Sequence, residues 1–330
     1  MAKNVLIIAE HQGGKIARPT WEAVAAGQRM AADSGGAASV VILGEQVSAL
    51  ASELATVRLG EVLVVQSPLL SNYTADGYVF SLQKVIRERA PDYVVLGHTY
   101  QTRDVAPKLA TALGAGFISD CLGYRKEDGR LVFNRQVFQG KFEADVEPVG
   151  RPPWLVSFQA GSFREDSVER VESHTHVASI QLEIPPGAIR TKPGDRFREA
   201  RQSVDLTQAE IIVAAGRGIK SPENLEMVKK LAEALGGEVG ASRPICDGGW
   251  LPMDRQIGSS GQTVAPKLYV ALGISGAIQH QVGMKGSRTI VAINKDKEAP
   301  IFEIATYGIV GDLFEIVPPL IEEIRKIKAG

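Results

Sequence analysis

The chain has 330 residues, of which 44% are hydrophobic and 23% are charged, and its formal net charge is −1. These totals are ordinary for a soluble globular protein of two domains, and they exclude binding to nucleic acid or an anionic membrane through overall charge. The two cysteines, Cys121 and Cys246, lack CxxC spacing, which argues against a disulfide framework or a zinc site and favours a reducing compartment.

The first hundred residues alternate short apolar runs with helical patterns, and the N-terminus enters the first run without a basic leader. No run reaches the roughly 20 residues of a membrane-spanning helix, so we expect a cytoplasmic protein. Strands are predicted at residues 4–9, 39–43, 61–65 and 93–96. Helices are predicted at residues 20–32, 75–89 and 103–113. This alternation predicts a mainly parallel sheet flanked by helices.

Beyond Cys121 the pattern of apolar and polar residues changes. The segments GRLVFNRQVFQGKFEADVEP and PPWLVSFQAGSF alternate apolar with polar residues around glycines, which predicts antiparallel hairpins that close the first domain. Residues 185–200, PPGAIRTKPGDRFREA, are rich in proline, glycine and charge and predict a linker. We therefore divide the chain into an N-terminal domain at residues 1–190 and a C-terminal domain at residues 191–330.

The βα alternation restarts after the linker, and it predicts a second mainly parallel, doubly wound sheet. Strands are predicted at residues 211–214, 238–241, 268–272 and 289–293. Helices are predicted at residues 222–235 and about 317–328. Ligands of such sheets lie beyond the carboxyl ends of the strands.

Glycine-rich and polar segments follow those predicted strand ends. Gly276 and its neighbours, ahead of His280, are the candidate cradle for a pyrophosphate, because glycine lets a phosphate approach backbone N–H groups. Arg217, between two glycines, is a second candidate anion contact. No GxGxxG follows the first strand of either domain, so the usual dinucleotide fingerprint is absent.

Other chemistry is poorly supported by the sequence. His174 and His176 share one face of a predicted strand but lack a third metal ligand. Ser162 and Ser167 have no visible His and Asp partners. A lone His280 would more often be a half-buried structural histidine. We predict no catalytic residue and no metal site.

At these residues the chain resembles the alpha subunits of electron transfer flavoproteins. LYVALGISGAIQHQVGMKGSRTIVAINKDKEAPIFEIATYGIVGDLF is similar to that family's C-terminal signature almost throughout. GRGIKSPENLEMVKKLAEALGGEVGASRP resembles the segment before it, and VLIIAEHQGGKI fits the family's opening strand. The likeness spans the chain and is densest from Gly216 to Phe314.

The resemblance implies an FAD in the second domain. By position, its contacts would be Arg217, Ser242, Arg243, Ile257, Gly258, Ser259, Ser260, Ser275, Gly276, Ala277, Ile278, Gln279, His280, Asn294, Asp312 and Leu313.

Each group of contacts has an implied role. Arg243 would lie against the isoalloxazine, and the hydroxyl of Ser260 would face flavin N5. His280 would hydrogen-bond the N1/O2 side, where it would become protonated and offset the charge added by reduction. The segment from Ser275 to Ala277 would hold the pyrophosphate, and Asn294 with Asp312 the adenosine end.

The resemblance also implies a beta subunit, carrying AMP or a second FAD, that docks on the first domain. The expected function is an electron carrier between acyl-CoA-type dehydrogenases and a quinone reductase or ferredoxin-type acceptor. Two alternatives stay open: a subunit of an NADH-oxidising, electron-bifurcating complex, and a stand-alone NAD-binding enzyme on a similar fold. Many relatives carry Gln or Met followed by Thr or Ser where this chain has Ser259 and Ser260, which leaves the flavin potential undetermined.

Overall fold

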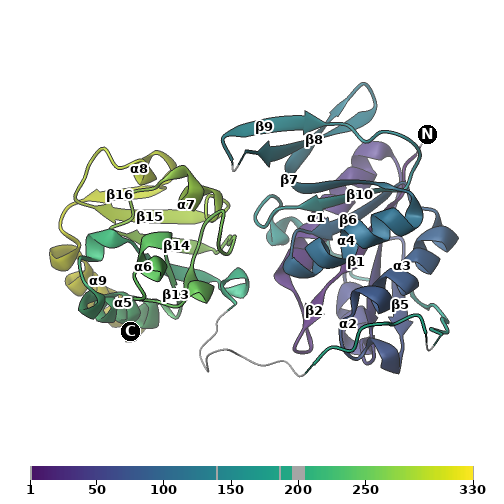
Figure 1. The fold of residues 1–330 in the computed structure, drawn as a ribbon, viewed down its shortest axis with the longest axis horizontal. Helices are drawn as coiled ribbons and strands as arrows, with labels where there is room; N and C mark the ends of the chain where they lie inside the picture. The colour runs from purple at the N-terminus through teal and green to yellow at the C-terminus, as the bar shows by residue number, and fades with distance from the viewer. Residues whose placement is uncertain (1, 139, 186, 195–204, 330) are drawn as a thin grey trace. The chain divides into compact units, whose positions relative to one another are not determined.

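The computed structural model describes residues 2–138, 140–185, 187–194 and 205–329. Residue 329 is described by its backbone alone. The chain divides into two compact units (Figure 1). The first comprises Met1–Gln136 with Glu143–Arg196, and the second comprises Val137–Phe142 with Phe197–Gly330. The predicted boundary after residue 190 stays a prediction, and residues 186 and 195–200 of the predicted linker lie outside the described residues.

The first unit is built on a large, mainly parallel sheet. Its strands are β1 Val5–Ala9, β4 Ala38–Gly44, β5 Val62–Gln66, β6 Tyr93–Gly97, β7 Gly116–Glu127, β8 Arg130–Val137, β9 Phe142–Val146, β10 Trp154–Phe158 and β11 Val177–Ser179. Over the described residues their order is β11-β5-β4-β1-β6-β10-β7-β8-β9. The connecting helices are α1 Arg18–Ser34, α2 Ser48–Leu54, α3 Ala75–Arg89 and α4 Tyr100–Leu113. A small antiparallel pair, β2 His11–Gln12 and β3 Lys15–Ile16, precedes α1.

One prediction for this unit was wrong. The segment PPWLVSFQAGSF was expected to form an antiparallel hairpin, but β10 lies between β6 and β7 and is parallel to both. Its residues are buried from Leu155 to Phe158, as befits a strand inside a sheet that is covered on both faces. The antiparallel expectation holds for β7 and β8.

The second unit contains a wholly parallel sheet in the described residues. Its strands are β12 Ile211–Ala215, β13 Glu238–Ala241, β14 Leu268–Leu272, β15 Thr289–Asn294 and β16 Tyr307–Val310. Their order is β13-β12-β14-β15-β16. This order reverses between β12 and β14, and open sheets of this kind bind ligands at that point. The predicted α/β class with two parallel-sheet domains is confirmed.

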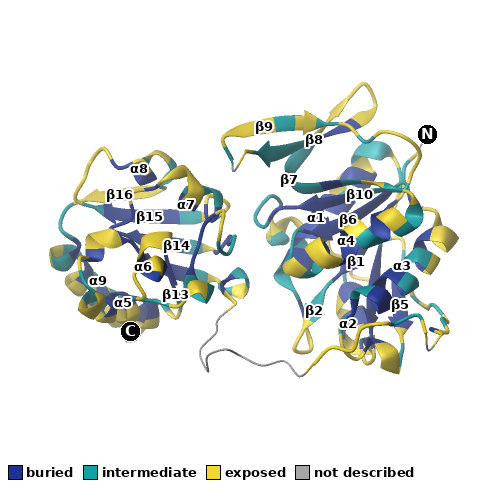
Figure 2. Ribbon diagram, viewed as in Figure 1, coloured by how far each residue is buried: buried dark blue, intermediate teal, exposed yellow. Residues whose placement is uncertain are grey.

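Helices cover both faces of the second sheet. They are α5 Leu225–Leu235, α6 Arg243–Asp247, α7 Ile278–Val282, α8 Ile301–Ile304 and α9 Leu313–Ala329. On one face, side chains of α5 and α9 pack with Val213 and Leu272. On the other, Ile257 and Met284 pack with Tyr269 and Ala271. The central strands are buried while β16 at the edge is exposed along its length (Figure 2).

Two helices are longer than the sequence predicts. The C-terminal helix was expected to begin near residue 317, yet α9 begins at Leu313. It begins early because the Asp312 carboxylate accepts the N–H of Phe314 at 2.9 Å, which satisfies one of the first free N–H groups of the helix. Pro318 and Pro319 lie inside it. At the other end of the chain, α1 extends two residues further than predicted on each side, to Arg18 and Ser34.

Candidate functional site

The predicted site residues gather at the carboxyl edge of the second sheet. Arg217 follows β12, Ser242 and Arg243 follow β13, and the segment of residues 275–280 follows β14. Asn294 ends β15, and Asp312 follows β16. Because all these strands are parallel, their carboxyl ends share one edge of the sheet. These residues therefore share one edge of the sheet, and their contact with a cofactor stays a prediction.

Three glycines bring two loops of this edge into direct backbone contact. The Gly216 N–H donates to Leu272 O at 2.8 Å, and the Gly218 N–H donates to Gly273 O at 3.0 Å. A Cβ on Gly216 would lie 2.3 Å from Gly273 O, and one on Gly218 would lie 2.5 Å from the Gly273 Cα. Only glycine allows the loops after β12 and β14 to meet at the point where the strand order reverses.

The loop after β14 presents a row of free backbone donors. Within the described part of the chain, the N–H groups of residues 275–279 have no hydrogen-bond acceptor. Gly276 fixes this conformation: its φ is +84°, and a Cβ there would lie 2.2 Å from the backbone nitrogen of Ile301. Ile301 N–H in turn donates to Ser275 O at 3.0 Å. A run of unpaired amides of this kind suits an anionic ligand such as a pyrophosphate.

Asn294, at the end of β15, supports this loop, and Asp312 follows the neighbouring strand β16. The Asn294 side-chain N–H donates to Ile274 O at 2.9 Å, and its oxygen accepts the Asp296 N–H at 3.1 Å. Asp312 Oδ2 lies 3.2 Å from Lys295 Nζ. The N–H of Phe314, and then Lys295, hold the pKa of Asp312 below its usual value, so this carboxylate is ionised. The predicted contacts of Asn294 and Asp312 with the adenosine end of a cofactor stay predictions.

The loop of residues 257–260 reaches this edge from the other face of the sheet. Ser259 N–H donates to Gln279 O at 2.7 Å, which ties the loop to α7. Gly258 has a φ of +145°, and a Cβ on it would lie 2.8 Å from the same oxygen. Ser260 is exposed, and its hydroxyl oxygen accepts an N–H of the buried Gln256 side chain at 3.0 Å. The hydroxyl hydrogen of Ser260 is therefore free to donate to a ligand.

His280 is buried, with only 6% of its surface exposed. Its Nδ1 lies 3.0 Å from Ile257 O, and its Nε2 lies 2.9 Å from the Tyr269 hydroxyl. Burial lowers the pKa of His280 to about 4, so the ring is neutral near pH 7. The predicted hydrogen bond from a protonated His280 to flavin stays a prediction, and it requires one of these two contacts to be exchanged.

The cationic candidates differ in how firmly they are held. Arg217 is exposed, as is Arg243, whose Nε lies 3.1 Å from Asp247 one turn further along α6. Ser242 is buried, and its N–H donates to Ala215 O at 2.9 Å. An exposed arginine with a single carboxylate partner can turn toward an aromatic or anionic ligand at small cost.

Sequence reasoning missed two buried polar residues of the site, Gln256 and Tyr269. Gln256 is 1% exposed, and its Oε1 has no partner among the described residues. Tyr269 lies in an apolar strand and was read as core. A polar group at a buried position next to a glycine-rich loop is the signal that could have found them.

These features fit an FAD. The free amides of residues 275–279 suit its pyrophosphate, the glycine contacts leave backbone accessible at the point where the strand order reverses, and Ser260 offers a free hydroxyl hydrogen. Among the described residues, no three His, Cys, Asp or Glu side chains gather to hold a metal ion. No helix in the described part of the chain is both long and apolar enough to cross a bilayer.

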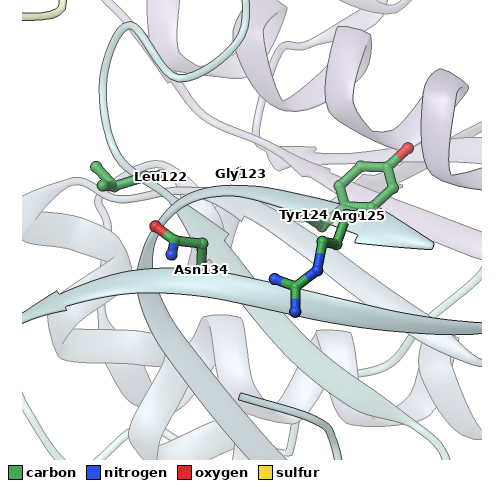
Figure 3. A pocket seen from close by; sticks show the side chains of 5 residues that line it. All are labelled: Leu122, Gly123, Tyr124, Arg125 and Asn134. Carbon is green, nitrogen blue, oxygen red and sulfur yellow. The ribbon is translucent and has the colours of Figure 1, made fainter. Parts of the chain in front are cut away.

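A shallow hollow of about 250 Å³ lies elsewhere, on β7 and β8 of the first unit (Figure 3). It is lined by Leu122, Gly123, Tyr124, Arg125 and Asn134. Tyr124 and Arg125, neighbours in β7, project to opposite sides of the strand. Arg125 pairs with Asp145 at 2.8 Å, and none of the predicted site residues lines the hollow. The hollow is therefore separate from the candidate cofactor site.

The rejected sites of the first unit look structural as well. Ser162 Oγ donates to Cys121 O at 3.2 Å, and Ser167 Oγ donates to Arg164 O at 2.6 Å. His174 and His176 precede β11 rather than forming part of it, and both are exposed. No hydrolytic or metal chemistry is indicated at these residues.

Two family models match the chain. The electron transfer flavoprotein domain matches residues 5–181, and the electron transfer flavoprotein FAD-binding domain matches residues 205–285. The chain is 40% identical over 327 residues to the electron transfer flavoprotein subunit alpha of Thermoanaerobacterium thermosaccharolyticum, with 99% of each chain covered. It is 41% identical over 329 residues to the same subunit of Bacillus subtilis, again with 99% of each covered. It is also 34% identical over 354 residues to the acryloyl-CoA reductase electron transfer subunit beta of Anaerotignum propionicum, covering 99% of this chain and 96% of that one.

Proposed function

Because the chain belongs to the electron transfer flavoprotein alpha-subunit family and contains its FAD-binding domain, we propose that it holds FAD as an electron carrier on the carboxyl edge of its second sheet. The observation that carries this placement is the row of unpaired N–H groups at residues 275–279. Of these five residues only Gly276 is buried, so the N–H groups of the others are open to an anionic ligand. FAD, when bound, supplies the redox chemistry.

The chain's own residues divide the work of binding. The amides of Ser275, Gly276 and Ala277 hold the pyrophosphate, and Ile278 and Gln279 continue the same row. Asn294, Asp312 and Leu313 hold the adenosine end.

The isoalloxazine end is bound by a second group of residues. Arg243, after β13, lies against the ring system. Ser242 and Arg217 contact the FAD from the loops after β13 and β12, and Arg217 offers its charge to an anionic group. The loop from Ile257 to Ser260 places a hydroxyl donor at flavin N5. Cationic and donor groups around the ring favour its reduced, more negative forms.

A beta subunit completes the heterodimer, as membership of the alpha-subunit family implies. We propose that it carries AMP or a second FAD and docks on the first unit. We also propose that electrons come from acyl-CoA-type dehydrogenases and leave to a quinone reductase or ferredoxin-type acceptor. The relative named as an electron transfer subunit of acryloyl-CoA reductase supports a partner that acts on acyl-CoA-type substrates.

The same relative supports a second candidate, a subunit of an NADH-oxidising bifurcating complex. A reductase of acryloyl-CoA consumes electrons, so a carrier that serves such an enzyme needs a source of electrons such as NADH. The third alternative from the sequence, a stand-alone NAD-binding enzyme, is not the family that the chain matches.

The test is a cofactor count on the chain co-purified with its candidate beta subunit, followed by titration with NADH. One FAD with AMP, and no bleaching by NADH, supports the simple carrier. Two FADs with bleaching by NADH support the bifurcating complex. A stable heterodimer without any flavin would contradict the placement of FAD in this chain.

A further inference from the structure

A buried chain of hydrogen bonds lies behind the loop that carries Ser260. Tyr269, the second residue of β14, is fully buried, and its hydroxyl lies 2.9 Å from Nε2 of His280. Nδ1 of His280 lies 3.0 Å from the carbonyl oxygen of Ile257. These hydrogen bonds therefore connect β14, the central strand of the second sheet, through the His280 ring to Ile257, the first residue of the loop at residues 257–260.

The positions of the protons follow from the partners. A carbonyl oxygen only accepts hydrogen bonds, so Nδ1 of His280 must carry a hydrogen. Two states satisfy both contacts: a neutral ring whose Nε2 accepts from Tyr269, or a charged ring whose Nε2 donates to Tyr269. Burial decides between them, because it lowers the pKa of His280 to about 4. Among the described residues no charged side chain acts on that pKa; the one opposing effect is the Ile257 carbonyl, and Tyr269 is the one titratable group in contact.

Further hydrogen bonds hold the loop and the residues after it to α7, the helix that contains His280, and to Gly283 directly after it. Ser259 N–H donates to Gln279 O at 2.7 Å, and Val264 N–H donates to Gly283 O at 2.8 Å. A Cβ on Gly283 would lie 2.4 Å from the backbone nitrogen of Gly258, so loop and helix touch without intervening side chains. A shift of the His280 ring would therefore move the loop and the hydroxyl of Ser260.

We propose that Tyr269 is a positioning residue, whose hydroxyl donates to Nε2 of His280, keeps the neutral Nδ1–H tautomer and thereby holds Ile257 and the loop of Ser260 in place. Its effect on electron transfer rests on the proposed FAD site, because the loop tunes a flavin only if it faces one.

The experiment uses the full chain in its complex with the beta subunit, with ¹⁵N-labelled histidine. The chain has 5 histidines, so His280 is assigned by comparison with His280→Gln. We expect wild-type His280 to show the Nδ1–H neutral tautomer without titration between about pH 5.5 and 8.5. In Tyr269→Phe the Nε2 loses its partner, and we expect its ¹⁵N resonance to move toward that of an unbonded nitrogen and the contact from Nδ1 to Ile257 to weaken on the order of fivefold. The one-electron reduction equilibrium of the bound flavin should shift by a similar factor.

Tyr307→Phe is the matched control, because Tyr307 lies on the exposed strand β16 of the same sheet. It should change neither the histidine spectrum nor the reduction equilibrium. An Nε2–H tautomer, or titration near the ordinary histidine pKa in the wild type, would overturn the proposal without any variant. Unchanged spectra in Tyr269→Phe would overturn it too. A complex without FAD would contradict the proposed function alone, since the tautomer is measured equally well without flavin.

Discussion

The carboxyl edges of the two sheets differ in the groups that they present: paired polar side chains after strands of the first sheet, and a glycine-containing loop with free N–H groups after β14 of the second. In the first unit, the Thr99 hydroxyl donates to Glu10 Oε1 at 2.6 Å, and Nε2 of His11 donates to Leu43 O at 2.8 Å. In the second unit, the N–H groups of residues 275–279 have no acceptor within the described residues. From this difference we infer that the glycine-containing loop after β14, rather than the parallel sheet itself, marks the ligand site.

Glu10 illustrates the paired side chains of the first edge. The Thr102 hydroxyl lies 2.6 Å from Gly97 O and 2.8 Å from Glu10 Oε1, and both oxygens accept from it. Burial raises the pKa of Glu10, and the hydrogen bonds from Thr99 and Thr102 act against this rise. These side chains therefore have partners inside the fold.

Replacing Gly276 should have the largest effect on FAD binding, and replacing a glycine of the first unit should have none. In Gly276→Ala the new Cβ would lie 2.2 Å from Ile301 N, at a φ of +84°. The row of amides must then shift, and we expect FAD affinity to fall by at least about 100-fold, as measured by flavin content and equilibrium binding. Gly114→Ala in the first unit is the control: its φ is +64°, but no atom lies within 4 Å. It should cost about 1 kcal/mol of stability and leave flavin content unchanged. Full flavin content in Gly276→Ala would contradict the cradle.

The units should also respond to pH with opposite signs, and Glu22 tests the first. Glu22 lies in α1, accepts the Gly161 N–H at 2.7 Å, and has its pKa raised from 4.5 to about 7 by burial. The folded state keeps a proton that the unfolded state releases, so stability falls as pH rises from 4.5 to about 7. We expect a loss approaching about 3 kcal/mol in denaturant titrations, and a flatter profile in Glu22→Gln. Equal slopes in both proteins would rule out this role.

His280 tests the second unit in the same way. Its pKa is lowered from 6.5 to about 4, so the unfolded state binds a proton that the folded state does not. Stability should therefore be lost as pH falls from 6.5 toward 4, again by about 3 kcal/mol. Denaturant titrations of the flavin-free chain should show this slope in the wild type and lose it in His280→Gln. Equal slopes in the wild type and His280→Gln would show that the ring is charged when folded.

Ser260→Ala should have the smallest effect. The hydroxyl accepts an N–H of the buried Gln256 side chain, so its loss should cost about 1 kcal/mol of stability. If the hydroxyl donates to flavin N5, the reduction equilibrium should shift about fivefold toward the oxidised form at unchanged flavin content. Ser259→Ala, at the neighbouring exposed position, is the control and should leave the equilibrium as it is. Identical equilibria in Ser260→Ala and wild type would remove Ser260 from the site.

Most of the central strands could be predicted from the sequence because they are buried on both faces. The run from Val5 to Ala9 is apolar throughout for this reason. The edge strand β16, with every residue exposed, gives no such run and was missed. The partners of β10 were also beyond the sequence, because a short apolar strand has the same pattern in parallel and antiparallel positions.

The site was predicted as a set of loops because glycine and polar residues follow successive strands. Its interior was not. Tyr269 is apolar core by pattern, and its hydroxyl gains meaning only when His280 and Ile257 are brought against it by the fold. The neutral state of His280 depends likewise on burial, which no local sequence pattern specifies.

The most direct test of the proposed FAD site is amide hydrogen exchange at residues 275–279, compared in the heterodimer with and without FAD. We expect rapid exchange without FAD and at least about tenfold slower exchange with it, because the flavin pyrophosphate accepts these hydrogen bonds. Residues around Glu10 and Thr102, whose groups are already paired, should exchange at the same rate in both samples. Equal exchange at residues 275–279 with FAD bound would contradict the proposed site.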